Sequence, residues 1–200
     1  MKEVKVRVYE LDELEPSVKE TVIYNAGQNI VASDWYTPIT EGFREEMECI
    51  GIIDADTYFS GFYSQGDGAC FICDTIDTDL LIRTLFESGY DISEDIVLET
   101  ENMNVIIQKL DNSFARQYDH ENTIAARINY EGDIISLGDI DKLEHTITLW
   151  AREISIGHYR NLEAYYDELT SDTHVSSELS GCLYFKDGRI ANSFIIPEEI

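Results

Sequence analysis

The residue pair with the clearest chemical potential is Cys70 and Cys73, which are separated by two residues. Thiols at this spacing hold metals or exchange disulfides when they share one turn beside a helix N-terminus. Here the flanking residues are typical of a strand, in which side chains three positions apart point to opposite faces of the sheet. No second Cys-x-x-Cys pair and no nearby pair of histidines completes a zinc site. The sequence therefore predicts two thiols that pack in the core, and no metal ligands.

Three aspartates offer the alternative of a metal-dependent enzyme. Asp54 and Asp56 share one face of a predicted strand, and Asp67 lies in the turn that follows it. Three carboxylates gathered there would suit Mg²⁺ or Ca²⁺, although carboxylates where a strand begins are more often simply solvated. The chain has no phosphate-binding loop, dinucleotide fingerprint or Gly-x-Ser-x-Gly motif. We therefore predict no catalytic residue and no cofactor, and keep the metal enzyme as an alternative.

Four histidines are dispersed along the chain, and no two of them stand four residues apart as in the metal-binding pairs of helices. His158 falls on the apolar stripe of a predicted helix, which favours a partly buried histidine with satisfied hydrogen bonds. His120 lies in the polar segment from Tyr118 to Asn122, a turn that suits either recognition or plain solvation. We include His120 among the predicted partner-binding residues.

Negative charge is the strongest global property of the chain. The sequence has 40 Asp and Glu against 14 Lys and Arg, a net charge of -26. This balance disfavours direct binding to DNA, RNA or an anionic membrane. A globule of this length has a diameter of about 42 Å, and duplex DNA of that length carries about 25 negative charges. Carboxylates could therefore replace phosphates in the groove of a nucleic-acid-binding protein, although an acidic surface also serves solubility.

Length and a hydrophobic content of 44% suit one core, so we expect a single acidic α+β domain over residues 1–200. The predicted elements are a strand at 2–9, helices at 16–31 and from Pro38 to about 50, a hairpin at 55–75, a helix from Asp77 to Gly89, a hairpin at 103–131, a helix at 140–169, a short helix capped by Ser171 or Asp172, and a strand at 183–185 entering a turn at 186–189. Residues 91–101 are acidic and weakly patterned. Together these elements predict an antiparallel sheet built from hairpins and packed against several helices, one of them long and C-terminal.

The sequence also indicates a compartment. No apolar run approaches the length that spans a bilayer, and the first residues lack the apolar region of a signal peptide. Four cysteines in a chain of this length do not form a secreted disulfide framework, and free thiols fit a reducing cytoplasm. We expect a cytoplasmic protein whose oligomeric state the sequence leaves open.

The segment from Tyr58 to Phe71 reads YFSGFYSQGDGACF, two aromatic-rich strands joined by a polar turn with two glycines. It resembles the motif YFSGFWSQGDGASF of a family of small bacteriophage-encoded proteins often labelled "antitoxin of toxin-antitoxin stability system". The chain departs from this motif at Tyr63 and Cys70, where tryptophan and serine are usual. Similar pieces occur in the same order over most of the chain: DWY at 34–36, HENT at 120–123, ELTSD at 168–172 and LYFKDG at 183–188.

The resemblance implies a phage accessory protein that acts inside a bacterial host, where such proteins commonly bind and inhibit host machinery or defence systems. We therefore predict a non-enzymatic inhibitor of a basic, nucleic-acid-handling host protein, such as a CRISPR effector, another nuclease or a transcription factor. The alternative is an antitoxin that neutralises a toxin by direct contact. The predicted partner-binding residues lie in the central turn, on one helix face and in two polar segments: Tyr63, Gln65, Asp67, Glu41, Glu45, Glu48, Asp91, Glu94, Asp95 and His120.

Overall fold

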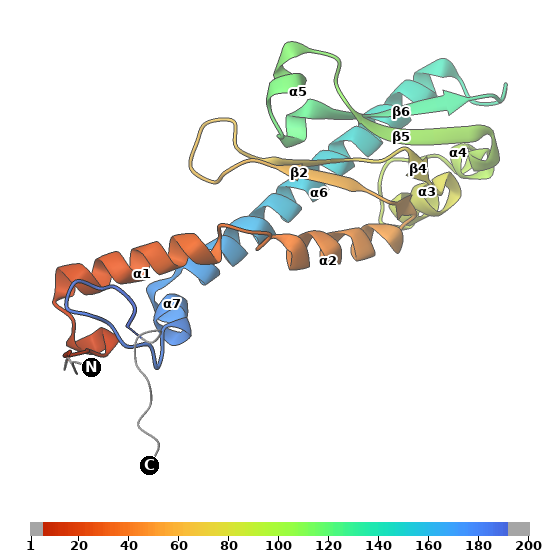
Figure 1. Cartoon of the computed structure of the whole chain (residues 1–200). Coiled ribbons are helices and arrows are strands. Elements are labelled where there is room, and N and C mark those ends of the chain that lie inside the picture. Colours follow the sequence, from red (N-terminus) through yellow and green to blue (C-terminus); the bar gives the residue numbers. More distant parts are fainter. Residues whose placement is uncertain (1–5, 192–200) are drawn as a thin grey trace. The chain divides into compact units, whose positions relative to one another are not determined.

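The computed structural model describes residues 6–191, which have an α+β fold (Figure 1). These residues group into two compact units, a smaller one that contains residues 6–36 and 164–191 and a larger one formed by residues 37–163. The expectation of one domain over residues 1–200 stays a prediction. Within the described range, no helix combines the length and the apolar character needed to cross a bilayer.

The smaller unit is helical. Its elements are η1 (Leu11–Glu13), α1 (Pro16–Ile30), the end of α6 (Leu137–Thr170) and α7 (Asp172–Glu178). Helix α1 begins at the predicted proline, and it buries Gly27 where a Cβ would lie 3.5 Å from a methyl group of Val175. Helix α7 begins after the predicted cap, because the Ser171 hydroxyl oxygen accepts the His174 amide at 3.2 Å. Both helix predictions are confirmed.

The predictions of a strand at residues 2–9 and of another at residues 183–185 are wrong in the part of the chain that the structure describes. Residues 6–8 form no strand, and residues 2–5 lie outside the described residues. Tyr9 makes an isolated bridge to Tyr184, and Tyr184 makes another to Ile190. A strand needs a ladder of partners, and single bridges provide one pairing position each. The predicted turn is confirmed, since the Phe185 amide donates to the Arg189 carbonyl oxygen at 2.8 Å.

The strands of the larger unit form three antiparallel pairs, of which two are the predicted hairpins. The pairs are β1 (Ile52–Ile53) with β4 (Thr75–Ile76), β2 (Asp56–Phe59) with β3 (Ala69–Ile72), and β5 (Met103–Lys109) with β6 (Ile124–Tyr130). A bridge links the last two pairs, because the amides of Cys73 and Ile107 each donate to the other's carbonyl oxygen at 2.9 Å. The hairpins are thereby held side by side.

The helices of the larger unit surround these strands. They are α2 (Thr37–Glu48), α3 (Thr78–Glu87), α4 (Glu94–Leu98), η2 (Thr100–Asn102), α5 (Ser113–Gln117), η3 (Glu121–Thr123) and α6. Helix α2 buries Phe43 and Met47 as predicted, and Asp77 caps α3 by accepting the Leu80 amide at 3.0 Å. Helix α6 has 34 residues and is therefore about 51 Å long. Helices α4 and α5 were not predicted, because five residues are too few to show a helical period.

Three aromatic rings mark the centre of the core. Phe71 of β3 is completely buried. Its ring packs edge to face against Phe43 of α2 at 5.6 Å and against Trp150 of α6 at 6.3 Å between centroids. The core therefore joins the β2–β3 hairpin to α2, which precedes it, and to α6, which follows much later in the chain.

Helix α6 also covers the outer edge of β6, which would otherwise offer unpaired backbone groups (Figure 1). The contacts are Thr148 Oγ1 accepting the Ala126 amide at 2.9 Å, Glu144 Oε1 accepting the Ile128 amide at 2.8 Å, and Arg152 Nη2 donating to the Ile124 carbonyl oxygen at 3.0 Å. Side chains of α6 thus form hydrogen bonds with backbone groups of β6 that a neighbouring strand would otherwise pair.

Candidate partner-binding surface

Two segments of the larger unit meet at one surface, which we call the loop face: residues 60–68, between β2 and β3, and residues 114–122, before β6. Two glycines allow this close approach. A Cβ at Gly66 would lie 3.1 Å from the Tyr118 ring, and one at Gly68 would lie 3.1 Å from the backbone of the second segment. The φ of Gly66 is +100°, a value that residues with a Cβ rarely adopt. The structure therefore brings together the two polar turns that the sequence singled out separately.

Asp67 organises the first of these segments. Its Oδ2 accepts the amides of Tyr63 at 3.0 Å and Ser64 at 2.7 Å, and its own amide donates to the Ser64 carbonyl oxygen at 3.1 Å. The Gln65 side chain, by contrast, is exposed at the tip of the loop. Asp67 thus has a structural task, while its predicted role in partner binding stays a prediction, as does that of Gln65.

Helix α6 also contacts the first of these segments, residues 60–68. The Tyr159 hydroxyl donates to the Gly61 carbonyl oxygen at 3.0 Å, and the Tyr159 ring packs 5.5 Å from that of Phe62. Burial, followed by nearby acidic groups that include Glu163, raises the pKa of the Tyr159 hydroxyl. Tyr159 was not predicted, since its only signal in the sequence is its position beside the apolar stripe of the helix.

Aromatic side chains give the loop face its exposed apolar area. Tyr63 is 78% exposed and Phe114 is 44% exposed. The Phe114 ring lies 4.9 Å from that of Tyr118 and 6.3 Å from that of His120. Aromatic residues of this kind frequently dominate protein–protein contacts. Tyr63 was predicted as a contact residue, whereas Phe114 was not, because α5 was missed.

His120 is held by its own turn. Its Nδ1 lies 2.8 Å from Glu121 Oε2 and 3.2 Å from the Asn122 amide nitrogen. The Asn122 amide donates to Nδ1, so the His120 side chain caps the short turn that follows it. The Thr123 hydroxyl in turn donates to the His120 carbonyl oxygen at 2.6 Å. His120 is therefore fixed in orientation on the loop face, and its predicted contact with a partner stays a prediction.

The two candidate thiols are buried, as predicted. Cys70 is 1% exposed and Cys73 is 3% exposed, and both belong to the core cluster. Burial raises the pKa of each thiol, and it outweighs the opposing hydrogen bonds that Cys70 makes with Thr123 and that the Cys73 thiol donates to the Thr75 and Ile53 carbonyl oxygens. Protonated, enclosed thiols are poor nucleophiles and poor metal ligands.

The three aspartates of the alternative metal site do not gather at one place in the described structure. Asp54 is exposed with a φ of +58°, Asp56 is exposed, and Asp67 is bound to amides of its own loop. Within residues 6–191, no group of three or more His, Cys, Asp and Glu side chains is placed to hold a metal ion. Side chains that share a strand face in sequence are thus not enough to form a site.

The remaining predicted residues form two acidic surfaces. Glu41, Glu45 and Glu48 are exposed on α2, and Asp91, Glu94 and Asp95 are exposed around the first turn of α4. Among the described residues, none of these six carboxylates has an ion-pair partner. The exposure that the helical spacing of α2 predicted is confirmed, whereas partner binding by these residues stays a prediction.

His158 differs from its prediction in one respect. It is buried, with 3% exposure, and its ring centroid lies 4.3 Å from that of Phe43, with the two rings tilted by 33°. However, neither ring nitrogen has a hydrogen-bond partner among the described residues, so the predicted satisfied histidine is wrong. Burial and the nearby Arg44 lower the pKa of His158 to about 4. The ring is therefore a neutral, aromatic part of the core.

The loop tip permits a test that separates structure from contact. Asp67→Ala is expected to lower the free energy of unfolding by about 1–2 kcal/mol, because two loop amides lose their acceptor. Gln65→Ala is expected to change it by less than about 0.5 kcal/mol, because Gln65 is exposed. Urea unfolding of both variants measures the difference. Equal destabilisation by the two changes would contradict the structural task given to Asp67.

Comparison with known proteins places the chain in a family. No curated protein and no solved structure matches it. Residues 35–172 match a family model that includes all of the larger unit, and with it both the loop face and the acidic face of α2. The matched part is more than half of the chain, and the protein therefore belongs to the family described as "Domain of unknown function (DUF8835)".

Proposed function

We propose that the protein is a non-enzymatic bacteriophage accessory protein that acts in the cytoplasm of a bacterial host. There it binds and inhibits a basic, nucleic-acid-handling host protein, with its carboxylates in place of phosphates. The phage origin is supported by the resemblance of the YFSGFYSQGDGACF segment to the phage family motif.

The observation that carries the proposal is the acidic face of α2. Glu41, Glu45 and Glu48 follow one another at intervals of four and three residues, so they advance by about 6 and 4.5 Å along the helix axis. Phosphates on one strand of duplex DNA advance by about 3.4 Å, a spacing of the same order. A rigid helix that presents unpaired carboxylates in a row can thus offer repeated charges to a basic groove.

The charge of the rest of the chain supports the same conclusion. The chain has few lysine and arginine residues, and several of them form salt bridges with nearby carboxylates. Examples are Lys19 with Asp12, Arg83 with Asp79 and Arg189 with Asp187. With a net charge of -26, the remaining carboxylates produce a negative potential that steers basic partners toward the protein.

The test begins with purification of the tagged protein from infected cells, followed by identification of the co-purified host protein. We expect a partner with a basic nucleic-acid site whose retention falls in 1 M salt, since charge attraction is screened there. A partner that lacks a basic site and is retained undiminished in 1 M salt would show that charge mimicry is wrong.

The acidic face of α2 is then tested with the isolated partner. The E41Q/E45Q/E48Q triple variant is expected to weaken binding by about 10-fold or more at low salt, because three charges leave the contact. Its matched control, E101Q/E168Q/E178Q, changes the net charge equally at exposed sites outside α2 and should weaken binding much less. Isothermal titration calorimetry of both triples measures this, and equal losses would place the contact elsewhere.

A second candidate is an antitoxin that neutralises its toxin by direct contact, which the exposed aromatic residues of the loop face favour. The same titration discriminates the two when it includes Tyr63→Ala. Loss of binding in this variant together with full binding by E41Q/E45Q/E48Q would favour the loop face and the second candidate. The reverse result favours the acidic face of α2.

A further inference from the structure

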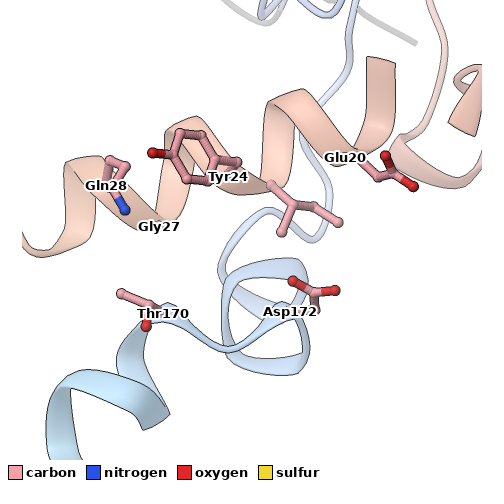
Figure 2. Close-up of a pocket in the computed structure, with 7 residues that line it drawn as sticks. Glu20, Tyr24, Gly27, Gln28, Thr170 and Asp172 are labelled. Atoms are coloured by element: carbon pink, nitrogen blue, oxygen red, sulfur yellow. The ribbon is translucent and has the colours of Figure 1, made fainter. Parts of the chain in front are cut away.

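The smaller unit contains a hollow of about 150 Å³ between α1 and the junction of α6 with α7 (Figure 2). Figure 2 shows Glu20 and Tyr24 on α1, and Thr170 and Asp172 on the opposite side. Ile23, which is 8% exposed, also lines the hollow. No sequence pattern indicated this site, because its two sides are far apart along the chain.

The hollow combines two negative charges with an aromatic ring. Glu20 and Asp172 are both exposed, and within residues 6–191 neither carboxylate has an ion-pair or hydrogen-bond partner. Tyr24 follows Glu20 by one helical turn and is 65% exposed. Carboxylates attract a cation, and the face of a tyrosine ring attracts it further.

The other residues of the lining suit the stem of a long side chain. Ile23 supplies a buried apolar surface, against which the methylene groups of a lysine or arginine can lie. Gly27 is buried and leaves the α1 backbone close to the end of α6, and the Gln28 amide and the Thr170 hydroxyl lie at the rim. The amide oxygen and the hydroxyl oxygen are further acceptors for N–H groups.

We propose that this hollow binds an arginine side chain of the partner protein. A guanidinium is planar, presents five N–H donors and is more weakly hydrated than an ammonium, so it can donate to the carboxylates of Glu20 and Asp172, with Tyr24 in the same lining. This inference rests on the proposed function for the basic character of the partner. It adds a second contact site, in the smaller unit, and the type of side chain recognised there.

The direct test uses N-acetyl-arginine amide as the probe and the full chain as the receptor. In an NMR titration we expect saturable shifts of the amides of residues 20–28 and 170–173, around the hollow. N-acetyl-lysine amide should bind more weakly, and N-acetyl-norleucine amide should not bind. Shifts that do not saturate, or that spread equally over α2, would overturn the proposal.

Matched variants separate the hollow from general charge. E20Q/D172N is expected to weaken binding of N-acetyl-arginine amide by about 10-fold, because both charge-assisted hydrogen bonds are lost. E168Q/E178Q changes the net charge equally in the same unit, at exposed positions outside the hollow, and should bind as the native protein does. Equal weakening by the two double variants would contradict a specific site. If E20Q/D172N melts at a lower temperature than the native protein, binding of N-acetyl-arginine amide is measured with the single variant Glu20→Gln, on the exposed side of α1.

The source of the guanidinium is tested with the co-purified host protein. We expect E20Q/D172N to weaken binding of this host protein. If the variant binds the host protein as the native chain does but no longer binds arginine amide, the hollow recognises a free guanidinium compound, and the proposal is overturned. If arginine amide does not bind while E41Q/E45Q/E48Q still weakens partner binding, this inference fails and the proposed function stands. If arginine amide binds but no basic partner is found, the proposed function fails.

Discussion

Alanine in place of Phe71 is expected to lower the free energy of unfolding of the larger unit by about 3–5 kcal/mol. The ring has no exposed surface and contacts aromatic rings from α2 and α6, so its removal opens a cavity that no single element can close. Because small proteins are stable by only about 5–15 kcal/mol, this change removes much of the total. Chemical unfolding followed by tryptophan fluorescence measures the loss.

The control for this prediction is Phe86→Ala on α3. Phe86 is 37% exposed, so its truncation removes fewer packed contacts and should have a much smaller effect. A loss at Phe71 no larger than that at Phe86 would mean that the three rings do not form the centre of the core.

Acid is expected to destabilise the larger unit through His158. The pKa of about 4 in the folded state lies below the unfolded value of 6.5, so the unfolded state binds the proton first as the pH falls. The stability that neutral His158 provides is therefore fully present above pH 6.5 and is lost progressively as the pH falls toward 4. The difference of pKa corresponds to about 3 kcal/mol at pH 4.

Variants isolate this effect from the titration of the many carboxylates. His158→Phe keeps a ring against Phe43 and cannot be protonated, so its stability relative to the native protein should rise by about 3 kcal/mol between pH 7 and pH 4. His145→Gln, at an exposed position of the same helix, is measured beside it as the matched control. Parallel curves for the native protein and His158→Phe in urea titrations at pH 7, 5.5 and 4 would refute the prediction.

Elements with a repeated local pattern could be predicted from the sequence. The spacing of Phe43 and Met47 fixed the buried face of α2, and with it the exposure of the glutamates opposite. Alternating aromatic and small residues before a glycine turn were sufficient for the β2–β3 hairpin, whose register pairs Tyr58 with Cys70. In both cases the information lies within about a dozen neighbouring residues.

Features that depend on distant parts of the chain could not be predicted. The contact between Gly68 and His120 joins residues that are 52 positions apart, and no local period encodes it. The same holds for the hollow between Glu20 and Asp172. His158 shows a third limit, because periodicity predicts that a side chain is buried but not whether a polar partner meets it there.

The cover of β6 by α6 gives the hairpin an unusual pattern of amide protection. Backbone groups of an antiparallel strand alternate in direction, so the amides of Ala126 and Ile128 face α6 while that of Arg127, between them, faces β5. Deuterium reaches the first two when the helix undocks and reaches the third only when the two strands separate. Alternate residues of one strand thus record two separate opening reactions.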